Sequence, residues 1–169
     1  MPIVLMASLT ASGAACALAI GVKPPQALGR SADARVLCTA DHLGRVLVVT
    51  FWASWCAPCL SEMRALESLQ RQAAGRLAVV AVNIEDRRRF LALHRAQSGD
   101  LSLTLSHDDD GRVREAWGVG PIPHTFLIDH EGRLAGEYRG YDDAFIPVLV
   151  DRIRELLRRR AANAAASAS

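Results

Sequence analysis

Two cysteines separated by two residues are the strongest candidates for chemistry in this sequence. Cys56 and Cys59 follow an apolar run, 46–51, and precede a segment, 57–69, whose apolar residues recur at helical spacing. A buried strand is therefore expected to lead directly into a helix, with both thiols at the junction. Unpaired N–H groups and the positive end of the helix dipole favour a thiolate there. Cys56, at the start, is the expected nucleophile, and Cys59, one turn further, the expected resolving thiol.

Apolar patterns also predict the elements that would position these thiols. The expected strands cover 46–51, 77–84, 101–105, 125–129 and 134–138, and the expected helices follow Cys56, Asp86, Gly111 and Asp142. The continuous apolar run 77–84 is typical of a strand covered on both faces, near the centre of a sheet. His124 has no neighbouring histidine or cysteine and is expected on the surface of a loop. The thiols then lie at the carboxyl end of a strand, where open α/β folds usually place function.

Two segments together resemble a known family. Residues 51–63, FWASWCAPCLSEM, resemble the active-site segment of thioredoxin-like thiol–disulfide oxidoreductases, and most closely the extracytoplasmic TlpA/ResA type used in cytochrome c maturation. Residues 118–129, followed by Gly132 and Gly140, resemble the cis-proline segment of the same family. Two motifs in the family's order and separation are far more specific than one pair of cysteines. The resemblance covers residues 36–157.

The resemblance implies the fold and the residues that meet a substrate. The expected fold is α/β and thioredoxin-like, with a central mixed β-sheet flanked by helices on both faces. Trp55, Ala57 and Pro58 would contact a substrate protein beside the cysteines. Pro123 is the expected cis-proline, because an X-Pro bond is the one peptide bond for which cis geometry costs little. The backbone of Ile122 would then pair with the substrate in a short β-like contact.

Glu62 is a candidate acid–base group. Thr50 stands six residues before Cys56, where typical thioredoxins carry a buried carboxylate, and a hydroxyl cannot replace that acid–base group near neutral pH. Glu62 lies six residues after Cys56 and matches a glutamate of the TlpA/ResA type, so it could take over. A solvated glutamate that complements the helix dipole is an equally open interpretation.

The ends of the chain differ in composition from the region between them. Residues 1–22 carry no charged side chain, which predicts a signal peptide or a membrane anchor. The sequence at 17–19 has the small-x-small form of a signal-peptidase site, but no basic residue precedes the apolar stretch. Residues 23–35, with two prolines, are expected to be a linker, 36–160 the folded domain, and 161–169 a disordered tail.

Composition excludes several classes of protein. The chain has 169 residues, half of them apolar, which allows one globular domain with a substantial core. Its formal charge is +2, its basic residues are scattered and its aromatic residues are few, so nothing favours nucleic acid as a partner. Four cysteines are too few for a disulfide scaffold at this length, and only one pair is closely spaced. The pair is therefore predicted to be catalytic.

We predict from these observations a thiol–disulfide oxidoreductase that needs no metal or other cofactor. Its partners would be protein disulfides in the periplasm or another extracytoplasmic space, and residues 2–22 could attach it to the membrane. The Ala57-Pro58 pair contains no histidine or cation to stabilise the thiolate strongly, which favours a reductant. A membrane protein would then supply the electrons, and the resemblance suggests apocytochrome c as a substrate.

Alternatives from other classes stay open at this point. Cys38, His42, Cys56 and Cys59 have a count and spacing that a structural zinc site permits. A non-catalytic adaptor could use the same scaffold, although it would not need both cysteines. A peroxidase is disfavoured, because its peroxidatic cysteine would not need this second one nearby. Cys38 itself is interpreted as a small, partly buried apolar residue or as a third redox-active thiol.

Overall fold

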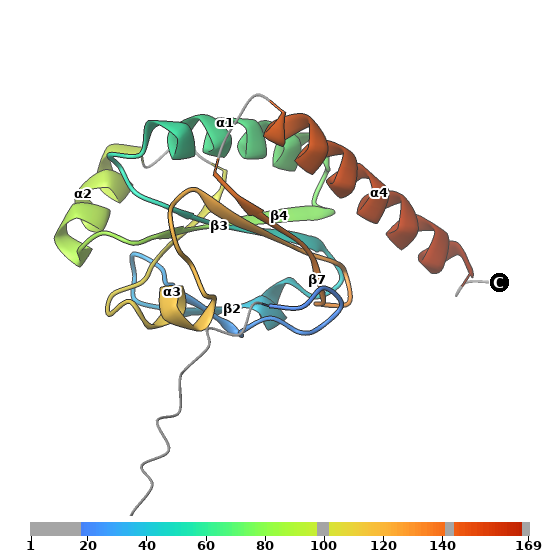
Figure 1. Ribbon diagram of the computed structural model, residues 1–169, viewed down its shortest axis with the longest axis horizontal. Helices are drawn as coiled ribbons and strands as arrows, with labels where there is room; N and C mark the ends of the chain where they lie inside the picture. The colour runs from blue at the N-terminus through green and yellow to red at the C-terminus, as the bar shows by residue number, and fades with distance from the viewer. Residues whose placement is uncertain (1–17, 98–101, 141–143, 167–169) are drawn as a thin grey trace, which may run out of the picture.

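The computed structural model describes residues 18–97, 102–140 and 144–166 of the chain. Seven strands and five helical segments follow one another in this part. They are β1 (Ala27–Arg30), β2 (Val36–Cys38), the 3-10 helix η1 (Thr39–His42), β3 (Val46–Trp52), α1 (Ala57–Gln72), β4 (Leu77–Asn83), α2 (Arg87–Gln97), β5 (Thr104–His107), α3 (Arg112–Ala116), β6 (His124–Ile128), β7 (Leu134–Arg139) and α4 (Phe145–Ala166) (Figure 1).

The strands form one mixed sheet in the order β2-β1-β5-β4-β3-β6-β7. Strands β3, β4 and β5 are parallel neighbours, whereas β6, β7, β1 and β2 join the sheet in antiparallel pairs. All seven residues of β3 and all seven of β4 are buried, as their continuous apolar runs predict for strands covered on both faces. The active-site strand β3 therefore lies in the interior of the sheet and holds its carboxyl end in a fixed place.

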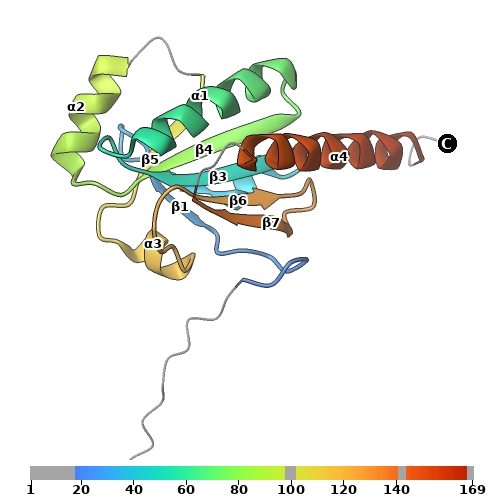
Figure 2. The same cartoon turned by 45° about the horizontal axis from the view of Figure 1, so that its top comes forward.

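Helices cover both faces of the sheet. Figure 2 shows α1 and α4 on one face and α3 on the other. Side chains of α1, α2 and α4 join one buried cluster with the residues of β3 that point to that face, among them Val46, Val48 and Trp52. Trp117, directly after α3, joins a second cluster with Phe51 and Phe126 on the opposite face. The predicted thioredoxin-like fold, a mixed sheet between two helical layers, is confirmed.

The prediction that residues 23–35 form a linker is wrong. Pro24 and Leu28 are buried, and β1 lies inside the segment, paired with β2 and β5. The carbonyl oxygen of Ala27 also accepts a hydrogen bond of 2.9 Å from the indole N–H of Trp117. The two prolines stand before the strand and therefore do not interrupt it.

The predicted ends of the chain need two further comments. The helix α4 continues to Ala166, five residues beyond the predicted start of a disordered tail at 161, because the run of alanines has a high helix propensity. The proposed cap Asp142 and residues 1–17 of the predicted signal peptide or anchor lie outside the described residues. No helix in the described ranges is long and apolar enough to cross a membrane.

Candidate active site at the disulfide

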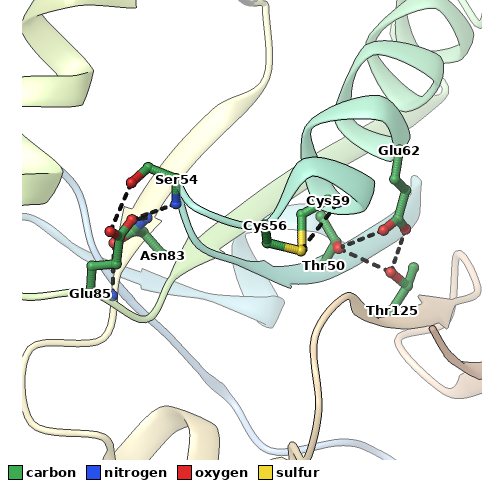
Figure 3. The surroundings of a disulfide bond; sticks show 8 residues. All are labelled: Thr50, Ser54, Cys56, Cys59, Glu62, Asn83, Glu85 and Thr125. Carbon is green, nitrogen blue, oxygen red and sulfur yellow. Dashed lines mark hydrogen bonds between the residues drawn. A yellow bond between two sulfur atoms is a disulfide. The ribbon is translucent and has the colours of Figure 1, made fainter. Parts of the chain in front are cut away.

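Cys56 and Cys59 form a disulfide at the junction of β3 and α1. Their sulfur atoms are 2.04 Å apart, and Cys56 is the N-cap of the helix (Figure 3). The backbone N–H of Cys59 donates to the Cys56 sulfur over 3.3 Å. An N–H of the first turn, which has no partner within the helix, therefore points at the atom that would carry the thiolate charge. Cys56 retains 6% of its surface and Cys59 only 1%. The more accessible sulfur is therefore the predicted nucleophile.

Glu62 is buried, so its interpretation as a solvated glutamate is wrong. Its side chain has no exposed surface, and Figure 3 shows it pointing from α1 toward β3 and β6. The Thr125 hydroxyl donates to Glu62 Oε1 over 2.5 Å, and the Thr50 hydroxyl donates to Oε2 over 3.4 Å. Burial raises the pKa of Glu62 to about 7, and the two hydrogen bonds offset only part of this effect. A carboxyl group that titrates near neutral pH thus lies one helical turn beyond Cys59.

A second glutamate holds the loop on the other side of the disulfide. Glu85 follows β4 and accepts hydrogen bonds from the Ser54 backbone N–H at 2.5 Å and from the Ser54 hydroxyl at 2.8 Å. Asn83 Nδ2 donates to the same carboxylate over 3.2 Å, and Arg89 pairs with it at 3.4 Å. Partial burial alone would raise the pKa of Glu85, but the bonds from Ser54, Asn83 and Arg89 outweigh it and hold the pKa below its usual value.

Sequence reasoning missed Glu85, although a signal was present. Asn83 is the last residue of β4, the parallel neighbour of β3, and Glu85 follows it by two residues. Because the carboxyl ends of parallel strands meet at the same edge of a sheet, polar residues at the end of β4 lie beside the loop that follows β3. That loop carries the two cysteines.

The second predicted motif contains a cis peptide bond. The bond between Ile122 and Pro123 is cis, which confirms the choice of Pro123 over Pro121. Pro123 is buried and Ile122 is partly buried, and the backbone N–H of Gly140 donates to the Pro123 carbonyl over 2.9 Å. The following strand, β6, pairs with β3, so the same sheet carries both the cis-proline loop and the cysteine loop.

His124 does not lie on a loop surface, and that prediction is wrong. It is the first residue of β6, pairs with Phe51 of β3 and is fully buried. Its Nε2–H donates to Glu137 over 2.9 Å, and its ring stacks on Phe126 with 4.5 Å between ring centroids. The strand begins directly after the cis-proline, so pairing with β3 turns the ring into the core. Burial lowers the pKa of His124, although Glu137 partly offsets this.

Three of the residues expected to meet a substrate are exposed beside the cysteines. Trp55 is 68% exposed, and Ala57 and Pro58 are exposed in the first turn of α1. Large aromatic side chains are seldom left this open to water unless a partner covers them. Trp55 is therefore available to an incoming polypeptide next to Cys56.

The proposed zinc site does not form. Cys56 and Cys59 are joined to each other at the carboxyl end of β3, whereas His42 lies before the amino end of this strand and accepts a hydrogen bond from Arg45. Within the described ranges, no three His, Cys, Asp or Glu side chains are grouped so that they could hold a metal ion. Cys38 is a free, partly buried thiol in the edge strand β2.

A strand-to-helix disulfide and a cis-proline loop on one sheet define the thioredoxin-like class of thiol–disulfide oxidoreductases. Residues 20–136 match the model of the AhpC/TSA family, and the chain belongs to this family.

Named relatives agree with this class. The chain is 33% identical over 138 residues to the thiol:disulfide interchange protein DsbE homolog of Paracoccus denitrificans, a match that covers 77% of this chain and 75% of that protein. It is 30% identical over 122 residues to the thiol-disulfide oxidoreductase ResA of Geobacillus thermodenitrificans, covering 70% and 68%. A crystal structure described as DsbE from Chlorobium tepidum superposes with a TM-score of 0.73 at 28% identity, over 83% of this chain and 99% of that one.

Proposed function

We propose that this oxidoreductase reduces disulfides of exported proteins outside the cytoplasm, with apocytochrome c as a candidate substrate. The observation that carries the proposal is the Cys56–Cys59 disulfide at the start of α1, with a buried glutamate one turn beyond it. The DsbE and ResA names of the relatives support the resemblance to the cytochrome c maturation type. A membrane protein would return electrons to the oxidised chain.

The reaction is dithiol–disulfide exchange. The Cys56 thiolate attacks one sulfur of the substrate disulfide, forms a mixed disulfide and releases the other substrate sulfur as a thiol. The Cys59 thiolate then attacks Cys56, closes the intramolecular disulfide and releases the second substrate thiol. Two electrons pass to the substrate, and the chain leaves the cycle oxidised. Trp55 and the Ile122 backbone would hold the substrate during the mixed-disulfide step.

Glu62 is the proposed proton acceptor for the second step. Cys59 is almost completely buried, and burial disfavours its thiolate. A nearby base must therefore take the proton of the Cys59 thiol as it attacks. A carboxyl with a pKa of about 7 is well matched to that transfer at neutral pH.

The charges near the nucleophile support the proposed direction of electron flow. A strongly oxidising pair needs a cation that stabilises the reduced thiolate. The two residues between the cysteines are Ala57 and Pro58, which supply no charge. Arg89, which reaches the same loop through Ser54, is already paired with Glu85. The Cys56 thiolate therefore gains little stabilisation beyond that from the helix N-terminus, and weak stabilisation of the thiolate favours a reductant.

The reduction potential of the pair tests this direction. The full chain is equilibrated in a series of redox buffers, and the oxidised fraction is read from thiol alkylation and tryptophan fluorescence. A potential near about −270 mV, the value typical of thioredoxin, supports a reductant. A potential near about −120 mV, typical of a strong oxidant, would reverse the assignment and make the chain a disulfide donor.

A trapping variant tests whether the pair acts on proteins at all. In Cys59→Ala, Cys56 can form the mixed disulfide but nothing resolves it, so substrate proteins remain covalently attached. Cys56→Ala is the matched control and should trap none. If Cys59→Ala also traps none and the wild-type chain reduces no protein disulfide, the adaptor interpretation replaces the enzyme.

A further inference from the structure

The folded domain begins without a spacer after the uncharged amino-terminal stretch. The Gly21 N–H donates to the Leu134 carbonyl over 2.7 Å, and the Leu134 N–H donates back to the Val22 carbonyl over 2.8 Å. Arg133 adds a side-chain hydrogen bond of 3.2 Å to the Gly21 carbonyl. In Figures 1 and 2 these first residues (blue) lie beside the β7 end of the sheet. The residues that complete the apolar stretch are thus already bonded into the domain.

Exposed large apolar side chains gather at this end. The described residues include six such side chains, and three of them lie here, namely Ile20, Val22 and Leu43. Val36 borders the hollow described below, but it pairs with Arg30, which pairs with His107 at the carboxyl end of β5. Leu43 lies against the turn that precedes β7, where its Cδ2 would be 2.8 Å from a Cβ placed on Gly132. The neighbouring Gly44 N–H donates to the His130 carbonyl over 2.9 Å. We call this end, made by residues 20–22, 42–45 and 130–134 with Arg35 and Arg71, the basal surface.

An arginine-lined hollow opens beside these apolar residues. Its volume is about 800 Å³, and Arg35, Arg45, Arg71, His42 and Asp41 line it. Arg71 is paired with Glu67 at 3.3 Å, and Arg35 interacts electrostatically with Asp33. Arg45 donates to the Asp41 carbonyl and to His42 Nδ1, and it has no carboxylate within ion-pair distance among the described residues. Burial lowers the pKa of His42, and the neighbouring Arg45 charge adds to this. A hollow that holds an arginine without an acidic partner, with two further guanidinium groups beside it, is complementary to a phosphate group.

The basal surface and the disulfide lie at opposite ends of the sheet. The hollow is lined by Leu77 at the amino end of β4, whereas the cysteines follow the carboxyl end of its parallel neighbour β3. Seven residues of strand at about 3.3 Å each separate the two ends by about 20 Å. A partner that covers the basal surface therefore leaves Trp55 and Cys56 accessible.

We propose that the basal surface rests on the membrane, with phospholipid phosphates in the arginine-lined hollow and the exposed apolar side chains at the headgroup level. The inference rests on the proposed membrane attachment through residues 2–22. Because residues 20–22 are bonded to β7, a chain anchored just before them holds this end of the domain at the bilayer surface. Apolar side chains mixed with arginines suit that interface, since lipid phosphates pair with the guanidinium groups. The membrane thus orients the active site toward the extracytoplasmic space.

Hydrogen exchange of the full chain tests the orientation. The chain is compared in zwitterionic detergent and in nanodiscs of phosphatidylcholine with phosphatidylglycerol. We expect exchange at residues 20–22, 35, 42–45 and 130–134 to slow about tenfold in nanodiscs, with no change around Trp55. The Arg35→Gln, Leu43→Asn double variant changes two exposed side chains and should lose this protection. The control Arg112→Gln, Val148→Asn, which changes another exposed arginine and another exposed apolar side chain away from this surface, should keep it.

Each other outcome overturns the inference in a recognisable way. If residues 1–17 are protected in nanodiscs but the basal surface is not, the anchor exists and the docking does not. If the mass of the mature protein shows that residues before Ile20 have been removed, the anchoring premise fails. If inorganic phosphate in detergent gives the same protection, the hollow is a site for a free anion. The reduction of a small disulfide, measured on the same samples, reports the oxidoreductase function independently of all three.

Discussion

Two glutamates flank the disulfide, and their surroundings push their pKa values in opposite directions. Glu62, on α1, is fully buried and receives only hydroxyl hydrogen bonds, so its pKa rises to about 7. Glu85, after β4, receives a backbone N–H, a hydroxyl, an amide and the Arg89 guanidinium, so its pKa falls below the usual range. Figure 3 shows one on each side of the cysteine pair.

The difference shows how the fold divides two tasks between identical side chains. A carboxyl that titrates near neutral pH can accept and return a proton during exchange, but it adds little stability when charged. A carboxylate that stays charged and fully bonded holds a loop in place but moves no proton. The extent of burial, together with the number and charge of the donors, decides between these roles, and the residue type alone does not.

The largest expected effect concerns stability and pH. Between pH 4.5, the unperturbed value, and about 7, folded Glu62 keeps a proton that the unfolded chain has lost. Stability therefore falls as pH rises through this window, and the loss is complete above it. Glu62→Gln removes the titration, so the oxidised variant should exceed the oxidised wild type by about 3 kcal/mol at pH 9 and match it near pH 4. Urea unfolding across pH measures the difference.

Glu85 should show the opposite dependence in the same experiment. Its folded pKa is depressed, so its contribution is complete above the unfolded value and is lost as pH falls through the folded one. Glu85→Gln should therefore lose stability relative to wild type at neutral pH and approach it in acid. If both variants changed stability in the same direction with pH, the division between the two glutamates would be wrong.

The second effect is on the rate of exchange. Without its proton acceptor, Cys59 should attack the mixed disulfide about 100-fold more slowly in Glu62→Gln at pH 7. The first attack by Cys56 should change little, because the helix start and not Glu62 stabilises that thiolate. Stopped-flow tryptophan fluorescence with a small disulfide substrate separates the two steps.

Glu67→Gln is the control for this rate effect. Glu67 is also buried on α1, but it binds the backbone N–H of Ser102, away from the disulfide. Its variant should resolve the mixed disulfide at the wild-type rate. An unchanged resolution rate in Glu62→Gln would remove Glu62 from the mechanism, even if the stability prediction held.

A smaller effect is expected when the loop loses its anchor. Glu85→Ala leaves the Ser54 N–H and hydroxyl without their acceptor, which costs about 2 kcal/mol. The amide of Ser54 should then exchange faster with solvent, whereas the pH at which Glu62 titrates should not move. A shifted Glu62 titration would show that the two sides of the site are coupled and not independent.

The local part of this site could be predicted from sequence, because each feature has a signal within a few residues. The apolar run of β3, the helical spacing after it and the cysteine pair identify the junction, and the proline motif identifies Pro123. Glu62 was identified by position, but its burial was not. That burial depends on Thr125, which lies 63 residues away and comes close only through the pairing of β6 with β3.

The errors have the same physical origin. His124 gave no apolar signal, and its ring is buried because β6 pairs with β3 directly after the proline. The strand β1 was not predicted because two prolines precede it. It is stabilised by pairing with β2 and β5 and by a hydrogen bond from Trp117, 90 residues away. Contacts between distant segments leave no periodic pattern in either segment, so a single sequence predicts the elements better than their partners.

The smallest expected effect tests the threonine pair that surrounds Glu62. Thr125→Val removes the hydroxyl that donates to Glu62 Oε1 over 2.5 Å, and this bond lowers the pKa of the carboxyl. The pKa of Glu62 should therefore rise by about one unit above the wild-type value, as NMR of labelled glutamate carboxyls can measure. Thr50→Val should raise it less, because the Thr50 oxygen is 3.4 Å from the carboxylate. If the two variants raised the pKa equally, desolvation by the added methyl groups and not hydrogen bonding would set the value. Glu62 would then differ from Glu85 by burial alone.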